Sequence, residues 1–149
     1  MKVLFINLVY GTGSTGKIIA DIMDMLKKYG NDAKALYGTG ARSDNADAVR
    51  VSGKLGYYFH NAVSRLTDHA GLYSWAATRR MIREIRAFQP DLIHLHTLHG
   101  FYVNYEMLFR FLKEANIPVV WTLHDCWTFT GHCTHFSQVK CVQWQTEGR

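Results

Sequence analysis

Several side chains that can donate, accept or hold protons lie at or just beyond two short apolar segments of this 149-residue chain. They are His94, His96, His99, His124 and Asp125. Imidazole titrates near neutral pH and can donate a hydrogen bond to a sugar hydroxyl or to a leaving phosphate. Strand alternation would put His94 and His96 on the same side of their strand. We expect His124 to face a ligand, with His96 next. Packing in the sheet is the simpler interpretation for His94, and surface exposure is the simpler one for His99.

A second candidate lies near the N-terminus, in the segment Gly11-Thr12-Gly13-Ser14-Thr15-Gly16-Lys17. It fits the pattern G-x-G-x-x-G and nearly fits the P-loop pattern, but Ile18 stands where the P-loop needs a magnesium-binding Ser or Thr. Glycines let the backbone approach a phosphate, which the start of a helix attracts. We predict contact with a donor diphosphate or sugar through five residues: Gly13, Ser14, Thr15, Gly16 and Lys17. A structural turn, a P-loop-like nucleotide hydrolase and a dinucleotide site remain open.

Five soft metal ligands gather near the C-terminus: Cys126, His132, Cys133, His135 and Cys141. Zinc favours tetrahedral sets of Cys and His, but the segment has no C-x-x-C pair and its spacings match no standard finger. We therefore expect a loop with buried thiols and no bound metal. The alternative is a zinc-bearing interaction module, whose candidate ligands for a structural zinc are Cys126, Cys133, His135 and Cys141.

Two other patterns have simpler explanations. Glu106 and Glu114 spell E-x₇-E, but this spacing puts them about 80° apart on a helix whose opposite side is apolar, so both can face solvent. Four arginines at helical spacing form a basic face that is ordinarily solvated: Arg79, Arg80, Arg83 and Arg86. Their functional alternative is contact with anionic lipid head groups or with a charged acceptor.

The composition is that of a single soluble domain, with 48% hydrophobic and 19% charged residues. The net charge of +5 suits anionic ligands or an anionic membrane surface, but it is too weak to argue for nucleic acid. The N-terminal apolar stretch is too short for a signal peptide, and no run approaches the length of a membrane span. We expect a cytoplasmic protein.

Apolar patterning predicts an α/β fold with a doubly wound parallel sheet. Buried strands are expected in four segments: 3–8, 33–37, 92–95 and 119–123. Helices are expected where apolar residues recur at helical spacing: 18–29, 55–66, 75–88 and 105–112. Ligands bind beyond the carboxyl ends of the strands in such sheets, where the glycine and histidine segments would lie. Such a sheet needs about six strands, and four or five are recognisable, so we expect a truncated chain.

Three segments resemble bacterial family 4 glycosyltransferases, of the branch associated with capsule and exopolysaccharide synthesis. They are the N-terminal segment through Lys17, the segment 91–105, and the segment 119–133, which is the most specific: Val-Val-Trp-Thr-Leu-His-Asp-Cys-Trp-Thr-Phe-Thr-Gly-His-Cys. The resemblance implies a retaining enzyme of the two-domain GT-B type. Residues 1–149 would be its Rossmann-like, acceptor-side N-terminal domain, without the C-terminal donor-binding domain.

The resemblance also implies roles for individual residues. His124 would lie at the reaction centre, His96 and Asp125 would shape the acceptor side, and Gly13 and Gly16 would approach the donor phosphates. The donor would be a nucleotide-diphosphate sugar, with a saccharide or lipid-linked acceptor and no required cofactor. The E-x₇-E motif of the family lies in the C-terminal domain, so this fragment alone is expected to be inactive.

Overall fold

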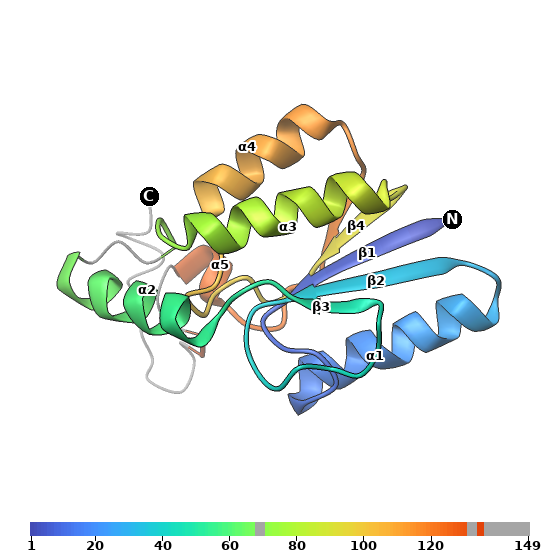
Figure 1. Cartoon of the computed structure of the whole chain (residues 1–149), viewed down its shortest axis with the longest axis horizontal. Coiled ribbons are helices and arrows are strands. Elements are labelled where there is room, and N and C mark those ends of the chain that lie inside the picture. The colour runs from blue at the N-terminus through green and yellow to red at the C-terminus, as the bar shows by residue number, and fades with distance from the viewer. Residues whose placement is uncertain (68–70, 131–133, 136–149) are drawn as a thin grey trace.

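Strands and helices alternate along most of the chain in the computed structural model, which describes residues 1–67, 71–130 and 134–135 (Figure 1). The strands are β1 (Lys2–Asn7), β2 (Asp32–Tyr37), β3 (Ala48–Arg50), β4 (Leu92–Leu95) and β5 (Val119–Trp121). The helices are α1 (Gly13–Lys28), α2 (Lys54–Thr67), α3 (Trp75–Phe88), α4 (Tyr105–Ala115) and α5 (Trp127–Thr130). None of the helices in the described residues is long and apolar enough to cross a membrane.

All neighbouring strands of the sheet are parallel, in the order β3-β2-β1-β4-β5. Helix α1 covers one face, and α3 and α4 lie on the other (Figure 1). The strand order runs outward from β1 in both directions, which is the doubly wound arrangement. The predicted α/β fold class is therefore confirmed.

Strand β1 is buried on both faces because its side chains alternate between two cores. Leu4 and Ile6 belong to the core beneath α3 and α4, whereas Val3 and Phe5 pack with residues of α1. All four side chains are at most 3% exposed. A central strand of a parallel sheet needs apolar residues on both sides, which is why this segment reads as a continuous apolar run.

Strand β5 departs from the prediction of a buried strand over 119–123. It is shorter, and Val119 and Val120 are 42% and 48% exposed. The cause is its position, since β5 lies at the edge of the described sheet and pairs there with β4. An apolar run alone does not distinguish an edge strand from a central one.

Helix α2 forms where its apolar spacing predicts, but with its apolar stripe turned outward. The side chains of Leu55 and Leu66 are 88% and 86% exposed, while the buried positions of the helix are His60 and Ser64. His60 hydrogen-bonds to residues outside the helix, whereas the Oγ atom of Ser64 has no partner among the described residues. Leu55 and Leu66 therefore contribute nothing to the core.

Candidate functional site

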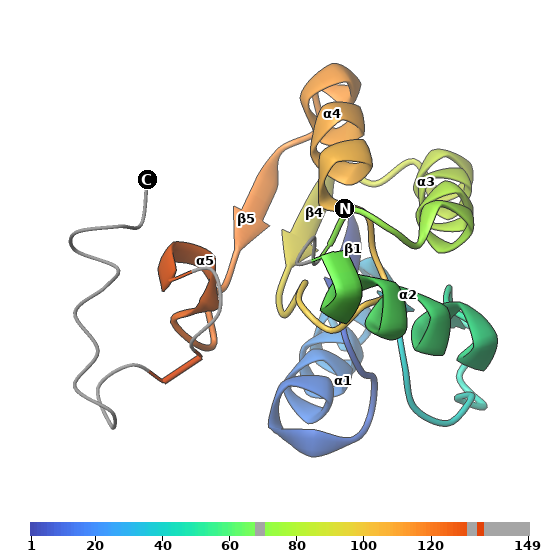
Figure 2. The same cartoon turned by 90° about the vertical axis from the view of Figure 1, so that its left-hand side faces the viewer.

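The histidines predicted from the sequence lie at the carboxyl edge of the sheet. This edge faces the viewer in Figure 2. Strand β4 stands between β1 and β5, so the segments that follow these three strands converge. His96 comes directly after β4, and its backbone N–H donates to the carbonyl oxygen of Ile6 in β1 (2.9 Å). His124 follows β5 at the same edge. The segments that carry His96 and His124 therefore meet at this edge, as the predicted topology implies.

His96 and His124 form a direct hydrogen bond, with 2.8 Å between Nδ1 of His96 and Nε2 of His124. Their rings are stacked, with centroids 5.1 Å apart. His96 is 2% exposed, and His124 is partly buried. One of the two nitrogens must carry the proton and the other must accept it, so the protonation states of the two rings are linked.

The surroundings of His96 favour its neutral form. Burial, followed by the nearby His94 and His124 rings, lowers the pKa of His96 from 6.5 to about 4. Its Nε2 atom is buried and makes no hydrogen bond to any residue that the structure describes. A buried polar atom without a partner is costly and calls for an explanation, such as an ordered water, a ligand or a catalytic role.

His94 shares the side of β4 on which His96 lies, as strand alternation predicts. The centroids of these two rings are 4.2 Å apart. Nε2 of His94 lies 2.8 Å from the hydroxyl oxygen of Thr122, and the indole N–H of Trp121 donates to the carbonyl oxygen of His96 (2.9 Å). These contacts hold the ends of β4 and β5 together. They could not be found from spacing, because they depend on which strands are neighbours.

Asp125 is held by its own partners at this edge. One carboxylate oxygen lies 2.7 Å from Nε2 of His99, and the other accepts from the backbone N–H of Trp127 at the start of α5 (3.0 Å). His96, which is predicted to shape the acceptor side as Asp125 is, pairs with His124. Asp125 therefore fixes the loop that carries His124.

Asn7, a buried residue at the end of β1, connects the glycine segment to the histidine edge. Its side-chain oxygen accepts from the backbone N–H of Thr97 (3.0 Å). Its amide nitrogen donates to the carbonyl oxygen of Val9 (2.8 Å) and to the hydroxyl of Thr15 (3.2 Å). Asn7 is the one polar residue in an apolar run, which is the signal that could have identified it.

The glycine segment forms a tight turn into α1. Gly13 has φ of 63°, a left-handed conformation that favours glycine. A Cβ atom on Gly16 would lie 3.1 Å from the Val9 side chain and 3.2 Å from the Gly11 nitrogen. Thr15 and Gly16 are therefore turned inward, whereas Gly13, Ser14 and Lys17 are exposed. The cap residue Thr12 makes no side-chain capping bond, so its hydroxyl does not occupy the amide groups of the first turn.

Little empty volume lies between the histidines themselves. The space bordered by His96, His99, His124 and Asp125 measures about 10 Å³, roughly what one water molecule needs. A sugar would have to bind over this edge and not between these side chains. Histidine and backbone groups of the edge would then contact one side of the ligand.

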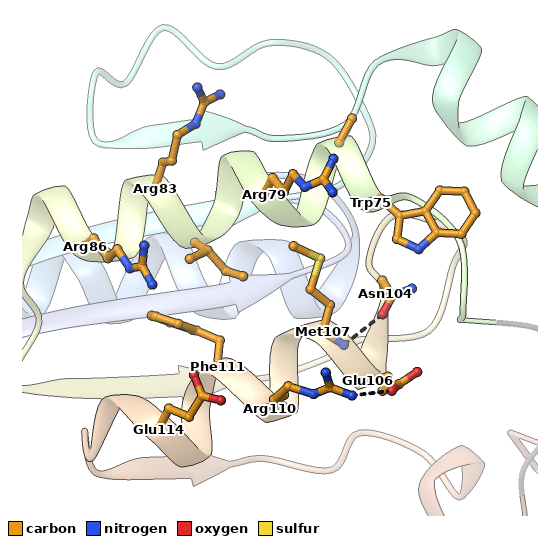
Figure 3. Close-up of a pocket in the computed structure, with 12 residues that line it drawn as sticks. Trp75, Arg79, Arg83, Arg86, Asn104, Glu106, Met107, Arg110, Phe111 and Glu114 are labelled. Carbon is orange, nitrogen blue, oxygen red and sulfur yellow. Dashed lines mark hydrogen bonds and ion pairs between the residues drawn. The ribbon is translucent and has the colours of Figure 1, made fainter.

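A much larger groove, of about 770 Å³, runs between α3 and α4 (Figure 3). Arg79, Arg83 and Arg86 line it from α3. On α4, Glu106 pairs with Arg110 (2.6 Å), and Glu106 and Glu114 are both exposed, as expected for a coincidental E-x₇-E pattern. None of the histidines or glycines singled out from the sequence borders this groove.

The candidate zinc ligands are only partly described. Cys126 is partly buried, and its backbone N–H donates to the carbonyl oxygen of Thr134 (3.0 Å). Cys133 and Cys141 lie outside the described residues. Over the ranges that the structure does cover, no group of three Cys, His, Asp or Glu side chains could hold a metal ion. The zinc alternative remains a prediction for the segment as a whole.

Comparison with known proteins agrees with this architecture. Residues 17–145 match the family model described as Glycosyltransferase Family 4. Over 158 residues the chain is 23% identical to a protein of Escherichia coli (strain K12) named as a colanic acid biosynthesis glycosyl transferase, WcaC. The alignment covers 98% of this chain but 38% of the E. coli protein, so the chain spans well under half of that relative's length. Because the family model matches most of a chain with this parallel α/β fold, the chain belongs to glycosyltransferase family 4.

Proposed function

We propose that this chain is the N-terminal domain of a retaining GT-B glycosyltransferase, which transfers a sugar from a nucleotide-diphosphate donor to a saccharide or lipid-linked acceptor. Family membership supports the reaction class. The observation that carries the residue assignment is the hydrogen-bonded pair of buried His96 and partly buried His124 at the carboxyl edge. Asn7, through its bonds to Thr97 and Thr15, joins this edge to the start of α1. On this proposal the fragment alone is inactive, and donor binding needs a second domain.

The start of α1 is suited to the donor diphosphate. Its first turn contains no acidic residue and no side-chain cap, and the side chain of Lys17 is exposed beside it. The free amide groups and the positive end of the helix dipole favour a phosphate there. Gly13 and Ser14 would contact it through the backbone, while Thr15 and Gly16 would shape the turn.

His124 would donate a hydrogen bond to the donor sugar. A neutral His96, whose pKa is lowered to about 4, can support His124 without adding a positive charge beside it. Retention of configuration would follow from attack on the same face, with the leaving phosphate taking the acceptor proton. No divalent metal is required in this scheme, because helix dipoles and cationic side chains stabilise the leaving diphosphate.

The acceptor side would be formed by His96 and by the loop that Asp125 holds in place. The name of the E. coli relative suggests colanic acid biosynthesis as the kind of pathway. We propose a cytoplasmic location at the periphery of the inner membrane, where a lipid-linked acceptor would be available. The exposed arginines of α3 are compatible with an anionic membrane surface.

The test is to incubate the full-length protein with UDP-, GDP- and ADP-sugars, and separately with ATP and Mg²⁺. We expect nucleoside diphosphate from one sugar nucleotide and no orthophosphate from ATP. Orthophosphate from ATP, with every sugar nucleotide intact, would contradict the proposal and favour a nucleotide hydrolase. Ile18, whose side chain has no oxygen to bind magnesium, argues against that second outcome.

A further inference from the structure

Helix α2 presents a continuous apolar stripe to solvent. Four large side chains of this stripe have more than half of their surface exposed: Leu55 (88%), Tyr58 (66%), Phe59 (58%) and Leu66 (86%). Their spacing places them along one side of the helix, within about 100° of one another. Large apolar side chains that are exposed singly are ordinary, but a contiguous stripe marks an interaction surface.

The outward orientation of α2 is determined by polar contacts on its opposite side. Gly71 donates its backbone N–H to Nε2 of His60 (3.2 Å), so Nδ1 of His60 carries the proton and donates to the hydroxyl of Ser74 (2.6 Å). Ser74 donates in turn to the carbonyl oxygen of Phe101 (3.2 Å). A helix turned to bury its leucines would lose this chain of hydrogen bonds.

The charged residues of α2 itself are positive. Lys54 and Arg65 lie on one flank of the stripe, and α2 contains no acidic residue. Near Lys54, a hollow of about 590 Å³ is lined by Arg50, Lys54 and Tyr58, among others. An anionic head group placed beside the stripe would therefore meet positive charge and a phenol hydroxyl.

Aromatic side chains also lie between α2 and α3, on the side of α2 that carries His60. Trp75 is 49% exposed, and its ring contacts that of Tyr73 (centroids 5.6 Å apart), which in turn contacts His60. Figure 3 shows Trp75 at the end of the groove, with its ring beyond Arg79. Tryptophan and tyrosine favour the boundary between a bilayer and water, because one end of each ring system is apolar and the other is polar.

We infer that α2 is a membrane-docking helix, which lies in the surface of an anionic bilayer with its apolar stripe among the acyl chains. An amphipathic helix with a basic flank has the chemistry for this position. A second copy of the chain fits less well, since a symmetric contact through this stripe would give the basic flank of each copy no acidic residue of α2 to pair with. Only the role of this docking rests on the proposed function: it would bring the enzyme to a lipid-linked acceptor.

The location of α2 links docking to the candidate site. The chain of hydrogen bonds from His60 ends on Phe101, which lies in the loop that follows β4 and carries His96 and His99. Figure 2 shows α2 at the carboxyl edge, in front of the sheet. A bilayer bound by α2 would therefore lie on the side of the molecule where the acceptor is proposed to bind.

The experiment is flotation of the full-length protein with two kinds of vesicle. One contains phosphatidylcholine alone, and the other contains phosphatidylcholine with an equal amount of phosphatidylglycerol. We expect binding to the anionic vesicles, and the double variant Leu55→Gln/Leu66→Gln should weaken it at least about tenfold. Lys54→Gln should weaken it about fivefold, with the difference disappearing at high salt.

The matched control is Met25→Gln/Tyr29→Gln, on α1 and at the residue directly after it, where both side chains are also exposed (53% and 75%). It should bind vesicles as the unaltered protein does. The inference is overturned if the unaltered protein does not float, if both double variants weaken binding equally, or if the α2 variant instead converts a dimer into a monomer. Flotation needs no donor or acceptor, so its failure would leave the transferase proposal standing, and a protein that floats but transfers no sugar would contradict only that proposal.

Discussion

Two buried histidines, His60 and His96, have opposite hydrogen-bonding environments. His60 is 0% exposed, and both of its ring nitrogens have partners, Gly71 and Ser74. His96 is 2% exposed, and its Nε2 has none in the described part of the chain. Burial lowers the pKa of both rings, so the pKa direction does not separate them. The complete set of partners around His60 is typical of a structural histidine, whereas Nε2 of His96 keeps a hydrogen-bonding capacity that no described residue uses.

The largest expected effect is a loss of catalytic turnover when His124, the hydrogen-bond partner of His96, is replaced. His124→Ala in the full-length protein should lower turnover about a hundredfold to a thousandfold, because it removes a hydrogen bond proposed to strengthen in the transition state. The melting temperature should stay close to that of the unaltered protein, since His124 is only partly buried. Steady-state kinetics with the preferred donor would measure this. An unchanged rate in the folded variant would remove His124 from the mechanism.

The next effect is on stability, at His60. His60→Ala should lower the free energy of unfolding by about 3 kcal/mol, because it leaves a cavity and deprives Ser74 and the Gly71 N–H of their partner. Denaturant titration would measure the loss. Turnover per folded molecule should be nearly unchanged, in contrast to His124→Ala. If His60→Ala instead abolishes turnover without destabilising the protein, the distinction between the two histidines fails.

Acidification should reveal the buried neutral state of His96. Its pKa in the folded protein is about 4, below the ordinary 6.5, so the unfolded chain takes up the proton first as the pH falls. The contribution of His96 to the free energy of unfolding is therefore fully present above pH 6.5 and falls by up to about 3 kcal/mol as the pH is lowered to 4. Below pH 4, titration of His96 causes no further loss of stability.

Denaturant titration across this pH range would test the expectation, with His96→Phe as the comparison. The variant should lose less stability on acidification, although His60 and His94, whose pKa values are also lowered, would keep part of the dependence. Equal pH dependence in both proteins would mean that His96 is not held neutral by the fold.

The smallest effect is expected at the E-x₇-E pattern on α4. Glu106 is exposed and pairs with Arg110 one turn along the helix, which is worth less than about 0.5 kcal/mol. Glu106→Gln should therefore leave both stability and turnover nearly unchanged. A large loss of turnover, measured in the same assay as for His124→Ala, would show that this face of α4 takes part in the reaction.

The sequence was sufficient for most of the sheet and for the placement of the histidines at one edge of it. The apolar run of β1 predicted a strand buried on both faces, and alternation correctly put His94 and His96 on one side of β4. The hydrogen bond between His96 and His124 could not be predicted, because a prediction would need the strand order and the side-chain rotamers as well as the sequence spacing. The exposure of Leu55 and Leu66 was also unpredictable, since periodicity identifies an apolar stripe but not the direction in which it faces.

The most direct test of the central claim compares the two histidines in one experiment. The full-length protein with ¹⁵N-labelled histidine would be titrated with the donor nucleotide-sugar while the imidazole resonances are followed by NMR. We predict that the resonances of His96 and His124 shift, with His60 unmoved because its polar contacts are already complete. A shift at His60 with His96 and His124 unmoved would contradict the assignment of the carboxyl edge as the site.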